Sequence, residues 1–363
     1  LQWTPHDSQN DPEAWDEYRG DPNNPIAPDW PRPELISDEK AGLSKGRPLG
    51  GSSQLFGAAP LEQIDEQTGD HMVVDWAIKQ MKQEREKPLF LAIGLFRPHI
   101  PWEVPRKWFD QYPLEEIKLP PYREDDLSDA HNHGRTHWHK WVIENHQWKK
   151  LMQGYLASIS YVDHQLGRIL DALDRTPSMK NNTIIVLWSD HGFHIGEKAN
   201  WEKFALWDQT SRVPLFIHAP GVSKDGEKTR QPATLTDVYP TLCELSDLPI
   251  PSQCDGLSLV SQLKNPGAKR DRLALCSFQF GNERNPSHGV ADERYRFIRY
   301  GNGFEELYDL QNDPHEYENL IDNPQFASVK TRLANGIPEN SATLAVLPRE
   351  SPHHRANQKK RRE

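Results

Sequence analysis

Cysteine is scarce in this sequence, and that scarcity limits what can hold the fold together. Only Cys243, Cys254 and Cys276 occur in 363 residues, too few for a disulfide-stapled scaffold. One bridge between Cys243 and Cys254 and three free thiols are both compatible with this number. The fold must therefore depend mainly on a buried apolar core.

The sequence also lacks an excess of positive charge and any long apolar run. Its formal net charge of −10 argues against nucleic acid as a bulk electrostatic partner. No apolar run approaches the ~20 residues of a membrane-spanning helix, so no membrane span is predicted. The sequence begins at Leu1 in a polar, proline-rich segment, and we therefore expect it to be the later part of a longer protein.

Polar residues are unevenly distributed, and their distribution predicts the domain organisation. Mean hydropathy is −0.82, but the polar excess gathers near both ends and in an internal segment rich in Pro, Trp and His. The predicted regions are a polar, proline-rich loop region (1–60), an α/β core (61–270), a small antiparallel subdomain (271–335) and a polar, disordered tail (336–363).

Continuous apolar runs and amphipathic stretches follow one another in the middle of the chain, and this order predicts an α/β fold. Continuous apolar runs predict buried strands, and amphipathic stretches predict helices between them. Such an order favours a mostly parallel sheet flanked by helices. The predicted strands are Leu89–Leu95, Thr183–Ser189 and Val213–Ala219, and the predicted helices are Met72–Lys87, Leu151–Leu173 and Thr236–Leu245. Farther on, Gly301-Asn302-Gly303 separates two alternating segments, which is typical of a β-hairpin.

Residues able to bind an anion or a cation follow the predicted strands. Asp190 and His191 come directly after Thr183–Ser189, and His99 follows Leu89–Leu95. Lys203 lies in the loop that returns toward the next strand. Ligands in open α/β sheets bind at the carboxyl ends of the strands. One carboxylate, two imidazoles and one ammonium group at this edge suit an oxyanion ester held between a cation and fixed donors.

Four blocks of the sequence resemble the later half of type I sulfatases, and most of all the iduronate-2-sulfatase branch. They are FLAIGLFRPHIPWEVPRKWFDQY, YLASISYVDHQLGRILDAL, SDHGFHIGEKANWEKFALWDQTSRVPLFIHAPG and ELYDLQNDPHEYENL. The resemblance covers residues 70 to 320 or so and keeps the order of the family's blocks. It implies an alkaline-phosphatase-like fold and hydrolysis of a sulfate ester of a sugar or polysaccharide outside the cytoplasm.

The resemblance also implies roles for individual residues. Asp190 and His191 match metal ligands, usually of calcium, although calcium prefers oxygen donors and His191 offers nitrogen. Lys203 and His99 match residues on two sides of the sulfate and are the implied catalytic pair. Phe193 and Phe204 match positions that line the sugar pocket.

Two parts of the family's site are missing from this sequence. The family makes its formylglycine nucleophile within Cys/Ser-x-Pro/Ala-x-Arg, and none of the three cysteines begins that pattern. The paired aspartates that follow the family's first strand are absent too. Asp125-Asp126 does not replace them, because it lies in a proline-rich loop and not after an apolar strand. We therefore expect a missing N-terminal segment or a partner chain to complete the site.

Other interpretations stay open at this stage. A phosphatase or phosphodiesterase of the same superfamily would need further metal ligands, for which Asp237, His288 and His315 are the downstream candidates. A non-catalytic, glycan-binding relative is the other alternative. Five histidines form a tract in which a second metal site is less favoured than an exposed substrate-side loop; they are His131, His133, His137, His139 and His146.

The missing nucleophile leads to a first prediction. This chain, purified alone, should not hydrolyse an aryl sulfate, because it lacks both the nucleophile and half of the implied metal shell. The measurement is turnover of an aryl sulfate beside a Lys203→Ala variant of the same chain. Turnover above that of the variant would contradict the prediction.

Overall fold

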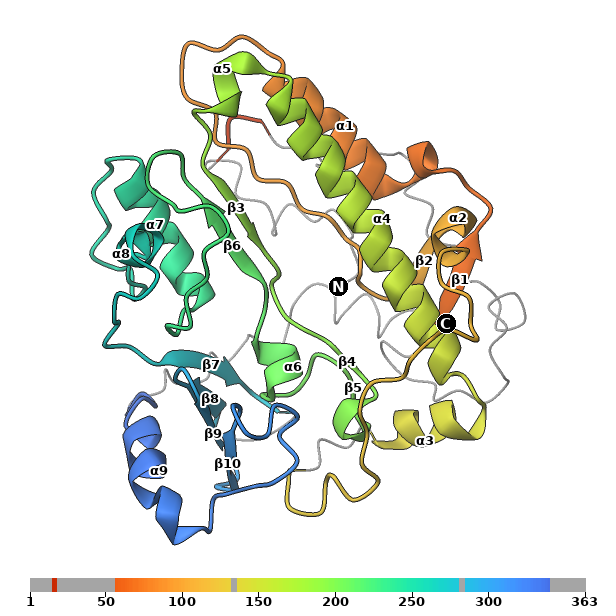
Figure 1. The fold of residues 1–363 in the computed structure, drawn as a ribbon, viewed down its shortest axis with the longest axis vertical. Helices are drawn as coiled ribbons and strands as arrows, with labels where there is room; N and C mark the ends of the chain where they lie inside the picture. The colour runs from red at the N-terminus through yellow and green to blue at the C-terminus, as the bar shows by residue number, and fades with distance from the viewer. Residues whose placement is uncertain (1–14, 18–55, 132–135, 281–284, 340–363) are drawn as a thin grey trace, which may run out of the picture. The chain divides into compact units, whose positions relative to one another are not determined.

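The computed structural model describes residues 15–17, 56–131, 136–280 and 285–339. The chain divides into two compact units, of which unit 1 covers 1–229 and 235–268 and unit 2 covers 230–234 and 269–363. Figure 1 shows their helices and strands. No helix within the described ranges is both long enough and apolar enough to cross a membrane.

Among the described residues, unit 1 contains eight α-helices and three short strand pairs. Its helices are α1 (Gly69–Met81), α2 (Arg106–Phe109), α3 (Thr136–Glu144), α4 (Trp148–Asp174), α5 (Pro177–Lys180), α6 (Asp208–Ser211), α7 (Val238–Leu245) and α8 (Val260–Lys264). Its strands are β1 (Ala58–Leu61), β2 (Trp102–Pro105), β3 (Ile185–Trp188), β4 (His194–Ile195), β5 (Trp201–Glu202) and β6 (Leu215–His218).

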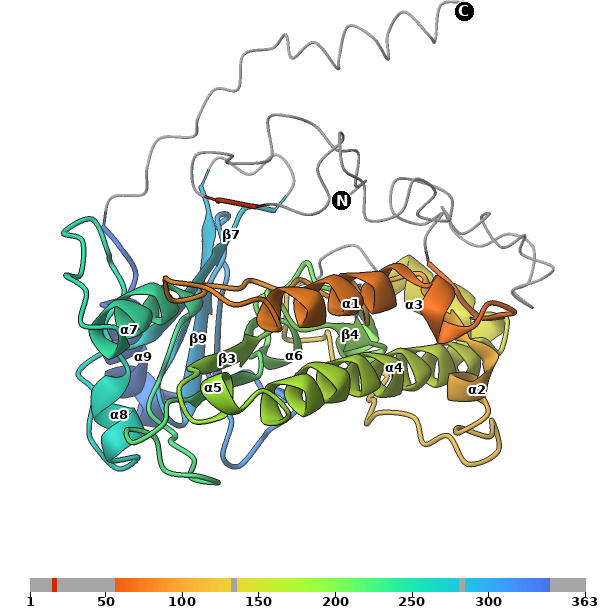
Figure 2. The same ribbon diagram turned by 90° about the horizontal axis from the view of Figure 1, so that it is seen from above.

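The predicted helices are confirmed, with one early end. Helix α1 stops at Met81 rather than Lys87. The guanidinium of Arg85 donates to the backbone oxygen of Gln80 at 2.7 Å, which satisfies a carbonyl that a longer helix would have bonded. Helices α1 and α4 lie side by side in both ribbon views (Figures 1 and 2).

Helix α4 buries a different face from the one that its apolar residues suggest. Ile159 and Leu170 are 37% and 39% exposed, whereas Gly154, Ser158 and Gln165 are buried. Glycine is required at 154 because β1 and β2 pass close to the helix there: a Cβ at Gly154 would lie 2.4 Å from Cβ of Ala58 and 3.0 Å from Cβ of Trp102.

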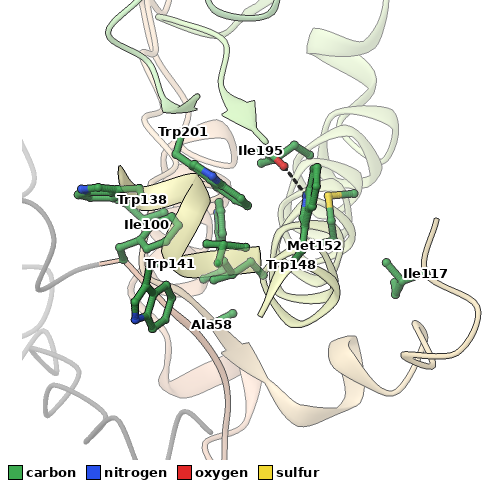
Figure 3. Packing of buried hydrophobic residues seen from close by; sticks show 13 residues of the cluster. Ala58, Ile100, Ile117, Trp138, Trp141, Trp148, Met152, Ile195 and Trp201 are labelled. Carbon is green, nitrogen blue, oxygen red and sulfur yellow. Dashed lines mark hydrogen bonds between the residues drawn. The ribbon is translucent and has the colours of Figure 1, made fainter. Parts of the chain in front are cut away.

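Tryptophan side chains dominate the main core of unit 1. Trp102, Trp148 and Trp201 are almost fully buried, and they bring β2, α4 and β5 into one cluster with α3 (Figure 3). Trp148 uses its indole N–H as well as its ring, because Nε1 donates to the backbone oxygen of Ile195 at 2.7 Å. Aromatic rings of this size bury much apolar area while keeping a polar contact available.

The segments predicted as strands at 183–189 and 213–219 do pair, but not in the parallel direction expected for a mostly parallel sheet. Strand β3 pairs with β6 in antiparallel fashion, with Ile185 opposite His218 and Trp188 opposite Leu215. An antiparallel return needs no crossover helix, and the intervening chain instead forms the β4–β5 hairpin and α6. Strands β1 and β2 do pair in parallel.

Two further expectations about these strands are wrong. Residues 89–95 form no strand, and Phe90 is 69% exposed. Strand β3 is not buried on both faces: Leu187, Trp188 and, on the neighbouring strand, Phe216 are 37%, 48% and 62% exposed. Burial on both faces needs a covering layer on each side, and the described residues do not provide one.

Unit 2 is a four-stranded antiparallel sheet covered by one helix. Its strands are β7 (Ala274–Phe278), β8 (Ser287–Ala291), β9 (Tyr295–Arg299) and β10 (Glu305–Asp309), in the order β10-β9-β8-β7, and its helix is α9 (Ala327–Ala334). The predicted hairpin is confirmed as β9 and β10, and Gly303 turns it with φ of +89°. Val290, Phe297, Leu307 and Leu333 form the core.

The cysteines contribute no bridge in the structure. Cys243, Cys254 and Cys276 are all free thiols, so of the two possibilities the three free thiols are the correct one. Packing, hydrogen bonds and ion pairs, with no disulfide, hold the described residues together.

The close approach at Gly154 gives a stability prediction with a control on the same helix. A Cβ at Gly154 would lie 2.4 Å from Cβ of Ala58, whereas nothing lies within 4 Å of a Cβ at Gly167. Gly154→Ala should therefore lower the free energy of unfolding by about 1–3 kcal/mol through overpacking. Gly167→Ala should raise it by about 0.5–1 kcal/mol through helix propensity. Chemical denaturation measures both, and equal effects at the two positions would contradict the packing.

Candidate active site

A buried carboxylate shapes the loop that carries His99. Asp70, in the first turn of α1, accepts hydrogen bonds from the backbone N–H groups of Phe96 (2.8 Å) and Arg97 (3.1 Å). The Arg97 side chain then donates to the backbone oxygens of His99 (3.0 Å) and Glu103 (3.1 Å). The loop is thereby held from both sides, and the position of His99 depends on these contacts.

A hydrogen bond to the backbone decides which nitrogen of His99 is protonated. Its Nδ1 lies 2.6 Å from the backbone oxygen of Ile100. A carbonyl oxygen only accepts, so Nδ1 carries the proton and the neutral ring keeps a lone pair on Nε2. That Nε2 lies 3.4 Å from Nζ of Lys203. The structure therefore brings Lys203 and His99 together, although 104 residues separate them.

Lys203 follows the β4–β5 hairpin, which is anchored at its turn. Ile195 N donates to Oε2 of Glu197 (2.8 Å), and Ile195 O accepts from Trp148. Gly196 adopts φ of +119°, and a Cβ there would lie 2.2 Å from the Trp148 ring. Only glycine fits such a conformation against an indole, and the Trp148–Ile195 hydrogen bond holds the turn against α4.

Asp190 and His191 lie just beyond β3, as the sequence predicts. His191 Nδ1 donates to the backbone oxygen of Gly192 at 2.7 Å, so that its Nε2 also keeps a lone pair. Oδ2 of Asp190 lies 3.7 Å from this Nε2, and the Asp190 side chain is 78% exposed. The two residues therefore present a carboxylate and an imidazole nitrogen close to one another.

Burial keeps both imidazoles neutral beside Lys203. Desolvation lowers the pKa of His99 and of His191, and the positive charge of Lys203 lowers both further. At neutral pH the only formal positive charge among these three side chains is therefore on Lys203. One cation beside the neutral nitrogen acceptor of His99 is an arrangement that can hold an anion and move a proton.

The two predicted aromatic positions differ in their surroundings. Phe193 is half-buried and packs against the tryptophan core, with its ring centroid 5.6 Å from that of Trp102 and 6.2 Å from that of Tyr155. Phe204 is half-buried directly after Lys203. A role for either ring in a sugar pocket stays a prediction.

The donor set fits a divalent cation only in part. Asp190 offers oxygen and His191 offers a nitrogen lone pair, but no group of three or more His, Cys, Asp or Glu residues able to hold a metal occurs among the residues that the structure describes. The histidine tract provides none there either. His139 is buried against aromatic rings, and His133 lies outside the described residues.

Several supporting residues escaped the sequence analysis. Asp70 lies just before the predicted helix Met72–Lys87, and its hydrogen bonds to a loop 26 residues away leave no local pattern. Asp126 and Lys198 form a buried ion pair at 2.8 Å, and no local pattern joins residues 72 positions apart. The Pro-rich setting of Asp126 did signal that it does not follow a strand.

Comparison with known proteins identifies the family. The family model described as Sulfatase matches residues 9–248, more than half of the chain, and a sulfatase of Formosa agariphila is 40% identical over 311 residues, which is 83% of this chain and 60% of that protein. The chain belongs to the sulfatase family. A second family model, N-sulphoglucosamine sulphohydrolase, C-terminal, matches residues 196–343 of this sulfatase chain.

Other likenesses confirm the resemblance and the fold. Iduronate 2-sulfatase of Mus musculus is 32% identical over 209 residues, or 46% of this chain and 37% of that protein. The phosphonate monoester hydrolase of Silicibacter pomeroyi has a TM-score of 0.67 at 20% identity, covering 84% of this chain and 66% of that one. This likeness confirms the alkaline-phosphatase-like α/β fold. This sulfatase chain spans about half the length of the curated relatives it matches.

The contact between Lys203 and His99 gives a prediction that needs no turnover. Lys203→Met should raise the pKa of His99, because a neighbouring cation no longer opposes protonation. The pKa should still stay below 6.5, because burial is its larger cause. NMR titration of the histidine Cε1–H signal measures the shift. Lys180→Met, on the exposed end of α5, serves as the control, and an equal His99 pKa in both variants would contradict the geometry.

Proposed function

We propose that this chain carries the Lys203–His99 part of a sulfatase active site that hydrolyses sulfate esters of a sulfated sugar or polysaccharide. The observation that supports this most strongly is the 3.4 Å approach of Lys203 Nζ to His99 Nε2, in a chain that belongs to the sulfatase family. Both side chains come from loops that are fixed by buried hydrogen bonds, which is the preorganisation that catalysis requires.

Lys203 would bind the ester through charge. A sulfate ester carries one negative charge, spread over its non-bridging oxygens, and the ammonium can neutralise charge that builds up there in the transition state. The neutral state of His99 and His191 matters here, because neither ring competes with Lys203 for the anion as a second cation. The same Nζ atom would therefore contribute both to binding of the substrate and to stabilisation of the transition state.

His99 would act at an oxygen near the leaving group. In the resting state its Nε2 is an acceptor, so it can position a hydroxyl by accepting a hydrogen bond from it. To protonate a leaving oxygen, His99 must first take up a proton itself. Its lowered pKa then makes the protonated ring a stronger acid. Positioning and acid catalysis are thus both open to His99, and the leaving-group dependence of the rate separates them.

Asp190 and His191 would supply two ligands of the divalent cation that the family uses. Calcium is the proposed ion, and it would offset negative charge on the ester; because His191 donates nitrogen, another divalent cation is the alternative. The formylglycine of the family supplies the nucleophile and has no counterpart motif among the cysteines of this sequence. A further segment or partner chain is therefore part of the proposal.

The exposed sheet of unit 1 supports such a completing segment. Leu187, Trp188 and Phe216 present apolar side chains on β3 and β6, and buried apolar area is worth roughly 25 cal/mol per Å². The segment that covers these strands would also approach Asp190, which follows β3 directly. We further propose an extracytoplasmic location, in keeping with sulfated polysaccharides as substrates, and Phe193 and Phe204 as sugar contacts.

Single substitutions in the complete enzyme test these roles. Lys203→Ala should lower kcat about 100- to 1,000-fold, the effect of losing one preorganised charged contact, and should leave the metal bound. His99→Ala should fall in a similar range, with a larger loss for poor leaving groups if it is the acid. Asp190→Asn should weaken cation affinity, because it removes a negative charge from the metal shell.

The measurements are rates on two sulfate esters with different leaving-group pKa values and metal content by elemental analysis. Lys180→Ala is the control for the loss of a surface lysine. Wild-type rates in both Lys203→Ala and His99→Ala would show that the site lies elsewhere. Unchanged cation affinity in Asp190→Asn would remove Asp190 from the metal shell.

The same assay separates the alternatives. A phosphatase or phosphodiesterase of the superfamily would hydrolyse the matching phosphate or phosphonate ester faster than the sulfate ester, and a glycan-binding relative would hydrolyse none of them. The likeness to a phosphonate monoester hydrolase shows the fold alone. The sulfatase function is favoured because one matching family model is described as Sulfatase and the other as the C-terminal part of N-sulphoglucosamine sulphohydrolase, an enzyme that removes a sulfo group from a sugar nitrogen.

A further inference from the structure

A buried ion pair holds the turn of the hairpin that leads to Lys203. The Lys198 ammonium donates to Oδ1 of Asp126 at 2.8 Å, and the two side chains are 1% and 2% exposed. Lys198 lies in the turn between β4 and β5, shortly before Lys203, whereas Asp126 lies in the 122–127 loop, 72 residues earlier in the chain. The pair therefore joins two segments that the local sequence does not connect.

Both charges are costly to bury, so each depends on the other. Desolvation raises the pKa of Asp126, and the charge and hydrogen bond of Lys198 oppose that rise. The second carboxylate oxygen of Asp126, Oδ2, makes no hydrogen bond, so the contact at Oδ1 carries the pairing. Removing one partner of a buried ion pair typically destabilises a protein far more than removing an exposed pair.

The backbone around the pair has a conformation that these residues would not adopt by themselves. Lys198, Ala199 and Glu202 have φ of +52°, +47° and +69°. Left-handed backbone is unfavourable for residues other than glycine, and it persists where surrounding contacts impose it. The β4–β5 hairpin has two paired positions. Such a short ladder gives little support of its own, so contacts from outside the hairpin must hold this conformation.

Two other contacts hold the strands of the hairpin. The indole N–H of Trp148 donates to the backbone oxygen of Ile195 on β4 (Figure 3), and on β5 the indole N–H of Trp201 donates to Nδ1 of His139 at 3.3 Å. Both hydrogen bonds lie outside the left-handed positions, whereas the ion pair holds one of those positions by its side chain. The direction in which the chain leaves the hairpin toward Lys203 therefore depends on the ion pair.

We propose that Asp126 is a positioning residue of the active site. Through the buried ion pair it holds the hairpin turn in its left-handed conformation, and it thereby keeps the ammonium of Lys203 within 3.4 Å of His99 Nε2. Asp126 touches neither of these two side chains in this role and acts through Lys198 alone. The value of this geometry for sulfate-ester hydrolysis rests on the proposed function, but the positioning itself does not.

The pKa of His99 reports the position of Lys203 in the full chain without turnover. Burial lowers this pKa and the charge of Lys203 lowers it further, so it should rise when the ammonium moves away. Asp126→Asn keeps the shape of the side chain but removes the negative charge opposite Lys198. Loss of a negative charge would by itself lower a histidine pKa. We expect the pKa of His99 to rise, and NMR titration of its Cε1–H signal measures the direction.

A double-mutant cycle with Lys203→Met shows whether the effect passes through Lys203. Asp126→Asn should raise the pKa of His99 in the wild-type background and leave it unchanged in the Lys203→Met background, where no ammonium remains to be displaced. A general loosening of the fold would instead raise the pKa in both backgrounds, because a more hydrated imidazole is easier to protonate. The cycle therefore separates positioning of Lys203 from a merely structural role.

Asp125→Asn is the matched control. It makes the same chemical change one position away, but Asp125 pairs with Arg123 at the surface, where the two side chains are 68% and 46% exposed. Exposed pairs contribute little, so His99 should titrate in this variant as in wild type. Near-UV circular dichroism confirms the folding of each variant. If Asp126→Asn does not fold, Lys198→Met replaces it in the cycle, because it removes the other partner and keeps a side chain of similar length.

In the complete enzyme, Asp126→Asn should lower kcat about 10- to 100-fold through misplacement of Lys203, whereas Asp125→Asn should not change it. Three results would overturn the proposal: a His99 pKa in Asp126→Asn that is no higher than in wild type, a rise of equal size in both backgrounds, or an active enzyme whose kcat Asp126→Asn leaves unchanged. The first would mean that the contacts of Trp148 and Trp201 suffice. An inactive complete enzyme in which the titrations follow the expected cycle would refute the sulfatase function alone.

Discussion

The contact between Trp148 and the Ile195–Gly196 turn is the one on which the site of this sulfatase depends. The indole lies on the long helix α4, donates to Ile195 O at 2.7 Å, and packs so closely on Gly196 that no side chain fits there. It thus fixes the β4–β5 hairpin, from which Lys203 and Phe204 continue. A helix of 27 residues offers a rigid base, so the ammonium is placed by the core of unit 1 and not by its own loop.

The His99 loop reaches the same place by a different route. Its backbone is held by the Asp70 carboxylate and its carbonyls by the Arg97 guanidinium. Burial opposes charge on both groups, since desolvation raises the pKa of Asp70 and lowers that of Arg97, while each favours the charge of the other. Loss of either partner would leave a buried charge uncompensated, which typically costs several kcal/mol. This mutual dependence keeps His99 within reach of Lys203.

The sequence predicts the elements of this protein better than their pairing. Helix α4, helix α7 and the β9–β10 hairpin follow from local periodicity and turn residues, which act over a few residues. The direction of β3 against β6, and the failure of 89–95 to form a strand, depend on which neighbours cover an apolar run. Apolar runs say that a segment needs a cover, but they do not say what provides it.

In the candidate site, too, residues with a local sequence signal could be predicted, and residues that act through distant contacts could not. His99, Asp190, His191 and Lys203 could be found because each follows a predicted strand or matches a family block. Asp70, Asp126 and His139 could not, because their roles arise from contacts across 26 to 72 residues of chain. The groups proposed to touch substrate thus leave a motif, whereas groups that hold other residues in place are visible only after folding.

Strand β3 lacks an apolar cover among the described residues, and the candidate cation site beside it lacks ligands. One added layer of chain could supply both. Strand β3 ends at Trp188, which is 48% exposed, and Asp190 follows two residues later with its side chain 78% exposed. An apolar layer that covered β3 would lower the local dielectric around Asp190 and strengthen its attraction for a cation. Further donors on that layer would add ligands to Asp190 and His191. In the proposed sulfatase, burial of the sheet and assembly of the metal shell would therefore be the same event, and the apolar contact would provide the free energy that brings the charged ligands together.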